Sequence, residues 1–274
     1  MKFKLFITFA FSSLTFLSCK AQTLSPNDFT KVPLPLIGSK ELYALNDRGG
    51  QEFSVSLING ELHIEKEVYQ SNTSFETPYG KLIGINHGEF GGGLYYKPND
   101  TTIKHINING KRQRKRKNEN PFSGSIVTPT NPITNLLKGT FLVKSGNIKR
   151  IFTYKDNIYT MEGLAHLSLN FGEFDQINVW GDSIVSSSVL DFDNSPEAFD
   201  IYDDAIYLAT SNNFYIVRNW KKELVFKKLF WGDLYPNSVA VKDNHHIYIG
   251  MRAGYAMIDA DSKEITFYKY NGKQ

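Results

Sequence analysis

The chain has 274 residues, and its 31 Lys and Arg side chains stand against 28 Asp and Glu, which gives a net charge of +3. Six of the bases lie between Lys111 and Lys117 and two more are Lys2 and Lys4, so the rest of the chain is mildly acidic, at −5. The sequence therefore describes a mildly acidic body that carries one basic patch. The single cysteine excludes a disulfide within the chain, so packing must stabilise the fold.

The first 19 residues have the pattern of an export signal. Met1–Lys4 is short and basic, and an apolar run of about 13 residues follows from Leu5 to Leu17. A helix needs about 20 apolar residues to cross a bilayer. The run therefore predicts a signal peptide rather than a membrane anchor.

Leu17-Ser18-Cys19 resembles the end of the signal in Bacteroidetes-type bacterial lipoproteins. The resemblance implies that Cys19 takes a diacylglyceryl group, becomes the mature N-terminus and carries fatty acids such as palmitate. Lipid would then hold the protein on a membrane of the cell envelope, on the periplasmic side of the outer membrane. Residues 20–35 form a tether in this interpretation, and residues 36–274 form the folded domain. The alternative is a secretory signal cut near Ala21, which yields a secreted or periplasmic soluble protein.

The C-terminal half contains a repeat. Pro196–Thr210 and Pro236–Met251 align, with their prolines 40 residues apart, and each has an Asp- or Asn-containing turn between two apolar stretches. Two further alternating stretches follow each of them. Four short strands in a unit of about 40 residues is the period of a β-propeller blade. Because 14% of the residues are aromatic and Ile, Val and Thr are abundant, we expect an all-β fold.

The pattern recurs less regularly upstream. Ile151–Met161 and Lys81–Tyr96 resemble further copies, and Glu41–Leu45, Glu52–Leu57 and Glu61–Ile64 supply strands for another. At about 40 to 48 residues per blade, the chain after the signal accommodates five or six four-stranded blades. Stacked sheets are the alternative, but they do not predict the repeat.

The stretch near 109–135 interrupts the pattern. It contains the basic run Lys111–Lys117 and several prolines, which oppose a central strand. We expect an exposed loop insertion there. It could contact an anionic membrane surface or an acidic partner, or remain a solvated loop. Export argues against a nucleic-acid partner.

Tyr235–Val241 resembles a segment of the gluconolactonase, strictosidine-synthase and YVTN-like propellers, over about two blades. The Asn of that segment is a divalent-metal ligand in those propellers, which implies this role for Asn237. Glu197 holds the equivalent place in the preceding repeat, and Glu89 and Glu162 add carboxylates from two other blades. Three carboxylates and an amide oxygen suit a hard cation such as Ca²⁺. The alternative is that these side chains bond the backbone where strands begin.

Three further side chains are candidates for chemistry at the same face. His87 and His166 lie close in sequence to Glu89 and Glu162, and could act as general base and acid in a lactonase- or esterase-like reaction. Arg252 could bind a ligand's carboxylate or phosphate. Packing or solvated histidines and a surface salt bridge are the alternatives.

The sequence thus leaves two hypotheses about function. The first is a monomeric, lipid-anchored propeller that binds a protein or small-molecule ligand of the cell envelope without catalysis. The second is a metal-assisted hydrolase with its site at the propeller axis. No motif of a nucleophilic hydrolase or a phosphate-binding loop is present in the sequence.

Overall fold

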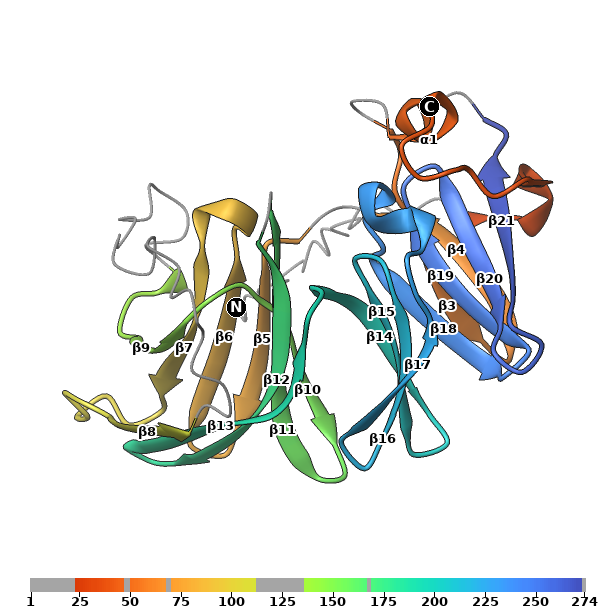
Figure 1. The fold of residues 1–274 in the computed structure, drawn as a ribbon. Helices are drawn as coiled ribbons and strands as arrows, with labels where there is room; N and C mark the ends of the chain where they lie inside the picture. The colour runs from red at the N-terminus through yellow and green to blue at the C-terminus, as the bar shows by residue number, and fades with distance from the viewer. Residues whose placement is uncertain (1–22, 47–49, 68–69, 112–135, 167–168, 273–274) are drawn as a thin grey trace, which may run out of the picture.

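The computed structural model describes residues 23–46, 50–67, 70–111, 136–166 and 169–272. Within these ranges the protein is all-β, as the sequence predicts, and it contains five sheets (Figure 1). The export signal, Cys19 and the insertion beyond Lys111 lie outside the described residues. No helix in the described ranges is long and apolar enough to cross a membrane.

We number the sheets 1 to 5 in chain order. Sheet 1 has the strand order β1-β4-β3, with β1 Thr23–Leu24, β3 Phe53–Ile58 and β4 Glu61–Lys66. Sheet 2 contains β5 Asn72–Thr77, β6 Gly80–Asn86, β7 Gly92–Pro98 and β9 Phe141–Ser145. Sheet 3 contains β10 Ile148–Tyr154, β11 Asn157–His166, β12 Leu169–Trp180 and β13 Ser183–Phe192, with β8 Asn107–Lys111 parallel to β13. Sheet 4 contains β14 Pro196–Tyr202, β15 Ala205–Thr210, β16 Phe214–Arg218 and β17 Lys221–Phe226. Sheet 5 contains β18 Ser238–Asp243, β19 His246–Met251, β20 Gly254–Asp259, β21 Glu264–Tyr270 and β2 Phe29–Val32.

The predicted repeats form equivalent antiparallel hairpins. Pro196–Thr210 becomes β14 and β15, and the segment after Pro236 becomes β18 and β19. Asp203 and Asp204 form the turn of the first hairpin with φ of 46° and 56°. The predicted third copy, β10 and β11, turns in the same way at residues 155–156, with φ of 46° and 63°. Asp tolerates this left-handed backbone, which explains Asp in these two turns, whereas residues 243–246 between β18 and β19 turn without a positive φ.

Neighbouring sheets pack face to face, and each shared face is a core. Among the described residues four cores join the sheets in the order 2-3-4-5-1. Side chains at most 2% exposed in these cores include Leu82 and Ile177 between sheets 2 and 3, Phe174 and Leu208 between 3 and 4, Phe214 and Ile247 between 4 and 5, and Ala240 and Phe53 between 5 and 1. A large side chain buried in this way stabilises the fold by about 1.5–3 kcal/mol.

The predicted tether, residues 20–35, differs in the structure, because its described part joins the sheets. β1 pairs with β4 in sheet 1, and β2 pairs with β21 at the outer edge of sheet 5. Leu24 and Phe29 are 7% and 6% exposed and belong to the core between these two sheets. The burial of Leu24 and Phe29 therefore stabilises this stretch as part of the folded domain. Through β2, the stretch also pairs with β21, the last strand of the chain.

Glu41–Leu45, predicted as a strand, is instead part of the helix α1 Lys40–Leu45. The hydroxyl of Ser39 caps the helix by accepting a hydrogen bond from the Leu42 N–H at 3.1 Å. Leu42 and Leu45, three residues apart, lie on one face of the helix and pack into the core of sheets 4 and 5. The alternating pattern of residues 41–45 also fits a strand. The segment forms a helix because a helix places Leu42 and Leu45 on the same face, where both can be buried.

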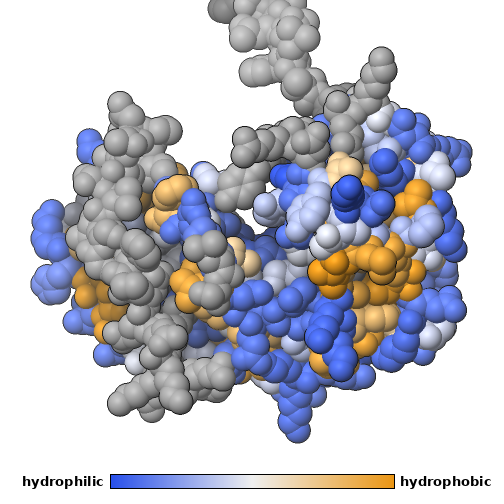
Figure 2. All heavy atoms as spheres, turned by 45° about the horizontal axis from the view of Figure 1, so that its top comes forward, coloured by the Kyte–Doolittle hydropathy of each residue, from blue (hydrophilic) through white to orange (hydrophobic). Residues whose placement is uncertain are grey.

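The short helices gather at one end of the sheets, which is uppermost in Figure 1. This upper end holds α1 and the 3₁₀ turns η2 Gly88–Phe90 and η3 Phe230–Leu234 (Figure 1); the fourth short element, η1, is Pro26–Asp28. Figure 2 turns this end toward the viewer and shows apolar surface on its right half, the half that carries α1. Leu36 and Ile37, which precede α1, are 78% and 65% exposed.

Candidate functional site

All the predicted site residues except Glu162 lie in turns or strand ends at the upper end. Glu89 lies in η2, between β6 and β7, and its carboxylate pairs with His166 Nδ1 of β11 at 2.8 Å. Both side chains are about 40% exposed, which weakens the pair. His87 precedes η2, and its backbone N–H donates to the Gly91 carbonyl at 2.8 Å. The structure thus brings His166 to a predicted carboxylate, on the side of the molecule formed by sheets 2 and 3.

Glu197 and Asn237 begin neighbouring sheets, as the sequence predicts, but each meets a base. The Lys149 ammonium, from β10, pairs with the Glu197 carboxylate and donates to Ser195 Oγ at 3.0 Å. The Arg150 guanidinium, from the same strand, donates to the backbone carbonyl of Asn237 at 3.4 Å. Two positive charges that the sequence analysis did not include therefore accompany the predicted cation ligands, and the Lys149 ammonium already neutralises the Glu197 carboxylate.

Arg252 lies between β19 and β20 and connects parts of the molecule far apart in sequence. Its guanidinium donates to Asn46 Oδ1 at 2.6 Å and to Glu52 Oε1 at 2.7 Å, and it stacks 4.5 Å above the Tyr235 ring. These contacts hold the end of α1 and the beginning of β3 against sheet 5. Arg252, which the sequence predicts as a ligand-binding residue, thus has partners within the protein.

Buried polar atoms without a hydrogen-bond partner collect at the same end. They are Asn147 Oδ1, Asn212 Oδ1, Asn237 Nδ2 and Arg252 Nε. Each belongs to a turn where strands of sheet 3, 4 or 5 begin or end. Buried polar atoms in folded proteins nearly always have a partner, so such atoms need an explanation in water or a ligand. These four atoms therefore come from three sheets at one end of the molecule, and water or a ligand would have to satisfy them.

A second constellation lies in the interface between sheets 2 and 3. Lys144 Nζ, from β9, contacts Glu162 Oε2 of β11 at 2.7 Å, Glu173 Oε1 of β12 at 3.0 Å and the Asp175 carboxylate of β12. All four side chains are at most 10% exposed. In the part of the chain that the structure describes, the three carboxylates are the one group of acidic, His or Cys side chains with ligand atoms within 4.8 Å of one another. We call these four residues the Lys144 cluster.

Strand register explains how the Lys144 cluster forms. Glu162 and Glu173 are direct cross-strand partners, and Asp175 lies two residues farther along β12, on the same face of sheet 3. A bulge in β9 lets two consecutive residues reach that interface, since Leu94 pairs with Lys144 and Tyr95 with Leu142, leaving Val143 between them. The turn after β9 then packs backbone onto the Glu162 carboxylate, because a Cβ at Gly146 would lie 2.4 Å from it.

Burial and neighbouring charges shift the pKa values of two groups in the Lys144 cluster. Burial, together with the charges of Glu173 and Glu162, raises the pKa of Asp175 to about 6, against the attraction of Lys144. Burial alone would lower the pKa of Lys144, but its attraction to the three carboxylates outweighs burial and raises it above its usual value.

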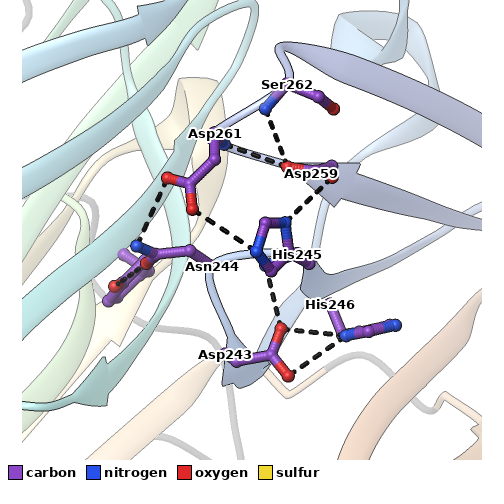
Figure 3. A network of polar contacts seen from close by, with 8 residues as sticks. Asp243, Asn244, His245, His246, Asp259, Asp261 and Ser262 are labelled. Atoms are coloured by element: carbon purple, nitrogen blue, oxygen red, sulfur yellow. Dashed lines mark hydrogen bonds and ion pairs between the residues drawn. The ribbon is translucent and has the colours of Figure 1, made fainter.

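An exposed polar network lies at the opposite end of sheet 5 (Figure 3). His245 Nδ1 contacts Asp259 Oδ2 at 3.1 Å, and His246 Nδ1 contacts Asp243 Oδ1 at 2.9 Å. Asp259 also accepts hydrogen bonds from two backbone N–H groups in its own turn, which lowers its pKa to about 2. These contacts connect the β18–β19 turn with the β20–β21 turn, so we assign them to turn stabilisation.

No family model and no curated protein matches this chain. Function must therefore be argued from the geometry. The sequence analysis missed Lys144, Glu173, Asp175 and Lys149. A signal for two of them was present, because Glu173 and Asp175 flank Phe174 within an apolar strand and so project from one face. The partners of these carboxylates depend on register, which a single strand does not reveal.

Proposed function

We propose that this chain is an exported, lipid-anchored β-propeller of five blades that binds a protein or small-molecule ligand of the cell envelope at its upper end. The orphaned polar atoms at that end carry the proposal. The exposed apolar side chains Leu36 and Ile37 support it, because they border the same end and suit a partner's apolar group.

The arrangement of the sheets supports the propeller. Sheets 2 to 5 each contain four strands in antiparallel succession. The first strands of neighbouring sheets touch, β5 with β10 and β14 with β18, and β18 also contacts β3, an edge strand of sheet 1. First strands that meet at the centre, with later strands farther out, are the arrangement of propeller blades around their axis.

The distance from Cys19 to the folded body bears on the lipid anchor. Thr23, four residues later, is already paired with Glu65. Four extended residues span at most about 14 Å. A lipid on Cys19 would therefore hold sheet 1 close to the membrane. Cys19→Ser should release the protein from the membrane fraction of a bacterial host and abolish incorporation of labelled palmitate. Retention of both would contradict the anchor.

The binding surface can be tested before the ligand is known. If Asn212 Oδ1 serves a ligand, Asn212→Ala should change the free energy of unfolding of the free protein by less than about 0.5 kcal/mol. Asn237→Ala should cost about 1 kcal/mol, because Asn237 Oδ1 accepts from Ser238 Oγ at 2.8 Å. Asn170 is the matched control. It lies at the same end, but it accepts from the Ser195 N–H at 2.6 Å and donates to Ser211 Oγ at 3.0 Å. Asn170→Ala should cost about 1–3 kcal/mol. Equal losses in Asn212→Ala and Asn170→Ala would contradict the proposal.

A ligand screen completes the test. Neutral oligosaccharides, dicarboxylates and inorganic phosphate are suitable probes, because the upper end combines amides with Lys149 and Arg150. At least one class should raise the melting temperature of the wild-type protein and leave Asn237→Ala unchanged. Hydrolysis of a lactone or ester by the wild-type protein, lost in Glu89→Gln, would instead support the metal-assisted hydrolase.

A further inference from the structure

The upper end carries exposed apolar side chains around α1. Leu36 and Ile37, in the loop between β2 and α1, are 78% and 65% exposed, and Tyr43 of α1 is 62% exposed. Leu42 and Leu45 of the same helix are buried in the core of sheets 4 and 5, so Tyr43 lies on the face of the helix that points away from the core. Three large side chains therefore face solvent close together in sequence.

Tyr235 adds a second exposed aromatic ring beside α1. It is 53% exposed, and the Arg252 guanidinium stacks 4.5 Å from its ring. The same guanidinium donates to Asn46 Oδ1, directly after α1, at 2.6 Å. Tyrosine has an apolar ring and a polar hydroxyl, and it is enriched where a membrane meets water. We call Leu36, Ile37, Tyr43 and Tyr235 the apolar patch.

The direction of the strands places the beginning of the described chain at the same end. Glu52, the residue before β3, bridges to Arg252 at the upper end, so β3 runs away from that end and β4 returns to it. Thr23, the first residue of β1, pairs with Glu65, near the end of β4. The chain therefore enters sheet 1 at the upper end, four residues after Cys19.

We infer that the apolar patch docks on the lipid bilayer of the cell envelope, with Leu36 and Ile37 inserted among the acyl chains and the two tyrosines at the headgroups. The inference rests on the lipid anchor of the proposed function, because the anchor decides which end of the protein faces the bilayer. Four extended residues span at most about 14 Å, so a lipid on Cys19 would bring the upper end to the membrane surface. Apolar side chains that reach the bilayer there are removed from water, which favours docking.

A bilayer explains two features together. A second copy of the chain, or another protein, would account for the exposed side chains of the apolar patch. It would not account for their position at the end where the chain enters from Cys19. The bilayer is therefore the occupant that the arrangement favours.

Vesicle binding by the chain from Lys20 onward tests the apolar patch without the lipid. This chain contains every described strand and helix, and it lacks the signal, whose apolar run would bind vesicles by itself. It should bind vesicles of phosphatidylethanolamine and phosphatidylglycerol. Leu36→Asp combined with Ile37→Asp should lower the partition coefficient by at least about tenfold, because both side chains would lose their burial in the bilayer.

Ile58→Asp is the matched control. Ile58 is 50% exposed beside the β3–β4 turn, at the opposite end of sheet 1. Its variant should bind vesicles as the wild-type chain does. The melting temperature of each variant should stay at the wild-type value, because the substituted side chains are exposed.

Salt separates the apolar patch from the basic run Lys111–Lys117, which could also attract an anionic bilayer. Exposed charges are screened at about 0.5 M NaCl, so binding through the patch should persist there. Leu36→Trp should fluoresce at shorter wavelength with vesicles and be quenched by brominated acyl chains, whereas Ile58→Trp should show neither effect. If the double Asp variant does not fold, this quenching decides.

Three results would overturn the inference. They are vesicle binding that salt abolishes, equal binding of the double Asp variant and the wild-type chain, and no vesicle binding together with self-association that the double variant loses in analytical ultracentrifugation. The last would assign the patch to a second copy. The anchor is judged separately. Vesicle binding without palmitate on Cys19 in cells would contradict the anchor and support the patch, whereas palmitate on Cys19 without vesicle binding would overturn the patch alone.

Discussion

Arg252 provides the most direct test of how the upper end is constructed. The variant Arg252→Met keeps the length of the side chain and removes its charge. Two charge-assisted hydrogen bonds are lost, to Asn46 at 2.6 Å and to Glu52 at 2.7 Å. Bonds of this kind contribute about 1.5–3 kcal/mol each. The paired Arg252 and Glu52 side chains are 20% and 23% exposed, so we take the lower end of that range, and expect a loss of about 3 kcal/mol.

Urea unfolding followed by Trp fluorescence measures this loss. For a protein of this size, about 3 kcal/mol corresponds to roughly 6–12 °C in melting temperature. Arg150→Met is the control, because Arg150 is exposed and makes one long hydrogen bond, of 3.4 Å. It should change the unfolding free energy by less than about 0.5 kcal/mol. If Arg252→Met unfolds at the wild-type urea concentration, its contacts do not hold the fold, and the guanidinium is free to bind a ligand.

Three more outcomes follow from packing and charge. Gly172→Ala should lower the unfolding free energy by about 3 kcal/mol in a urea titration, because the new Cβ would lie 2.0 Å from Pro196 Cδ; a wild-type midpoint would refute the close packing. Trp231→Phe should cost about 2 kcal/mol by the same measurement, since the buried indole N–H donates to a backbone carbonyl at 3.0 Å; no loss would show that this bond is dispensable. The hydrogen bond to Asp259 raises the pKa of His245 above 6.5. The protonated pair therefore stabilises the fold below that pH, and this stabilisation is lost as pH rises through the folded-state pKa of His245. In Asp259→Asn, an NMR titration should show the pKa of His245 shifted back toward its ordinary value. An unchanged titration would contradict the pairing.

The repeating strands were predictable because local chemistry specifies them. The turns at residues 155–156 and 203–204 use left-handed backbone that Asp tolerates, and the flanking strands alternate or are apolar throughout. α1 was missed because Glu41–Leu45 fits a strand and a helix equally well. Only the Ser39 cap and the distant core that receives Leu42 decide between them.

The predicted site was recovered only in part, for reasons of register. The repeat shows where turns and strand ends fall, and it correctly predicts that Glu197 and Asn237 lie where two adjacent sheets begin. The partners of these residues come from β10, whose alignment against β14 and β18 no local pattern encodes. The Lys144 cluster needs, in addition, a bulge in β9 and a cross-strand pairing between β11 and β12. Both depend on how strands pair in the folded protein, which the sequence of a single strand does not reveal.

The pairing of β2 with β21 also orders the folding reaction. Thr30 Oγ1 donates to Asn271 Oδ1 at 2.7 Å across 241 residues of sequence. A chain made from its N-terminus therefore holds β2 without a partner until its last strand is complete. Closing so long a loop is slow, because its entropy is lost before the contact forms. Sheet 5 should be the last to acquire protection from hydrogen exchange, and a chain shortened before Glu264 would leave both β20 and β2 with an unpaired edge open to aggregation.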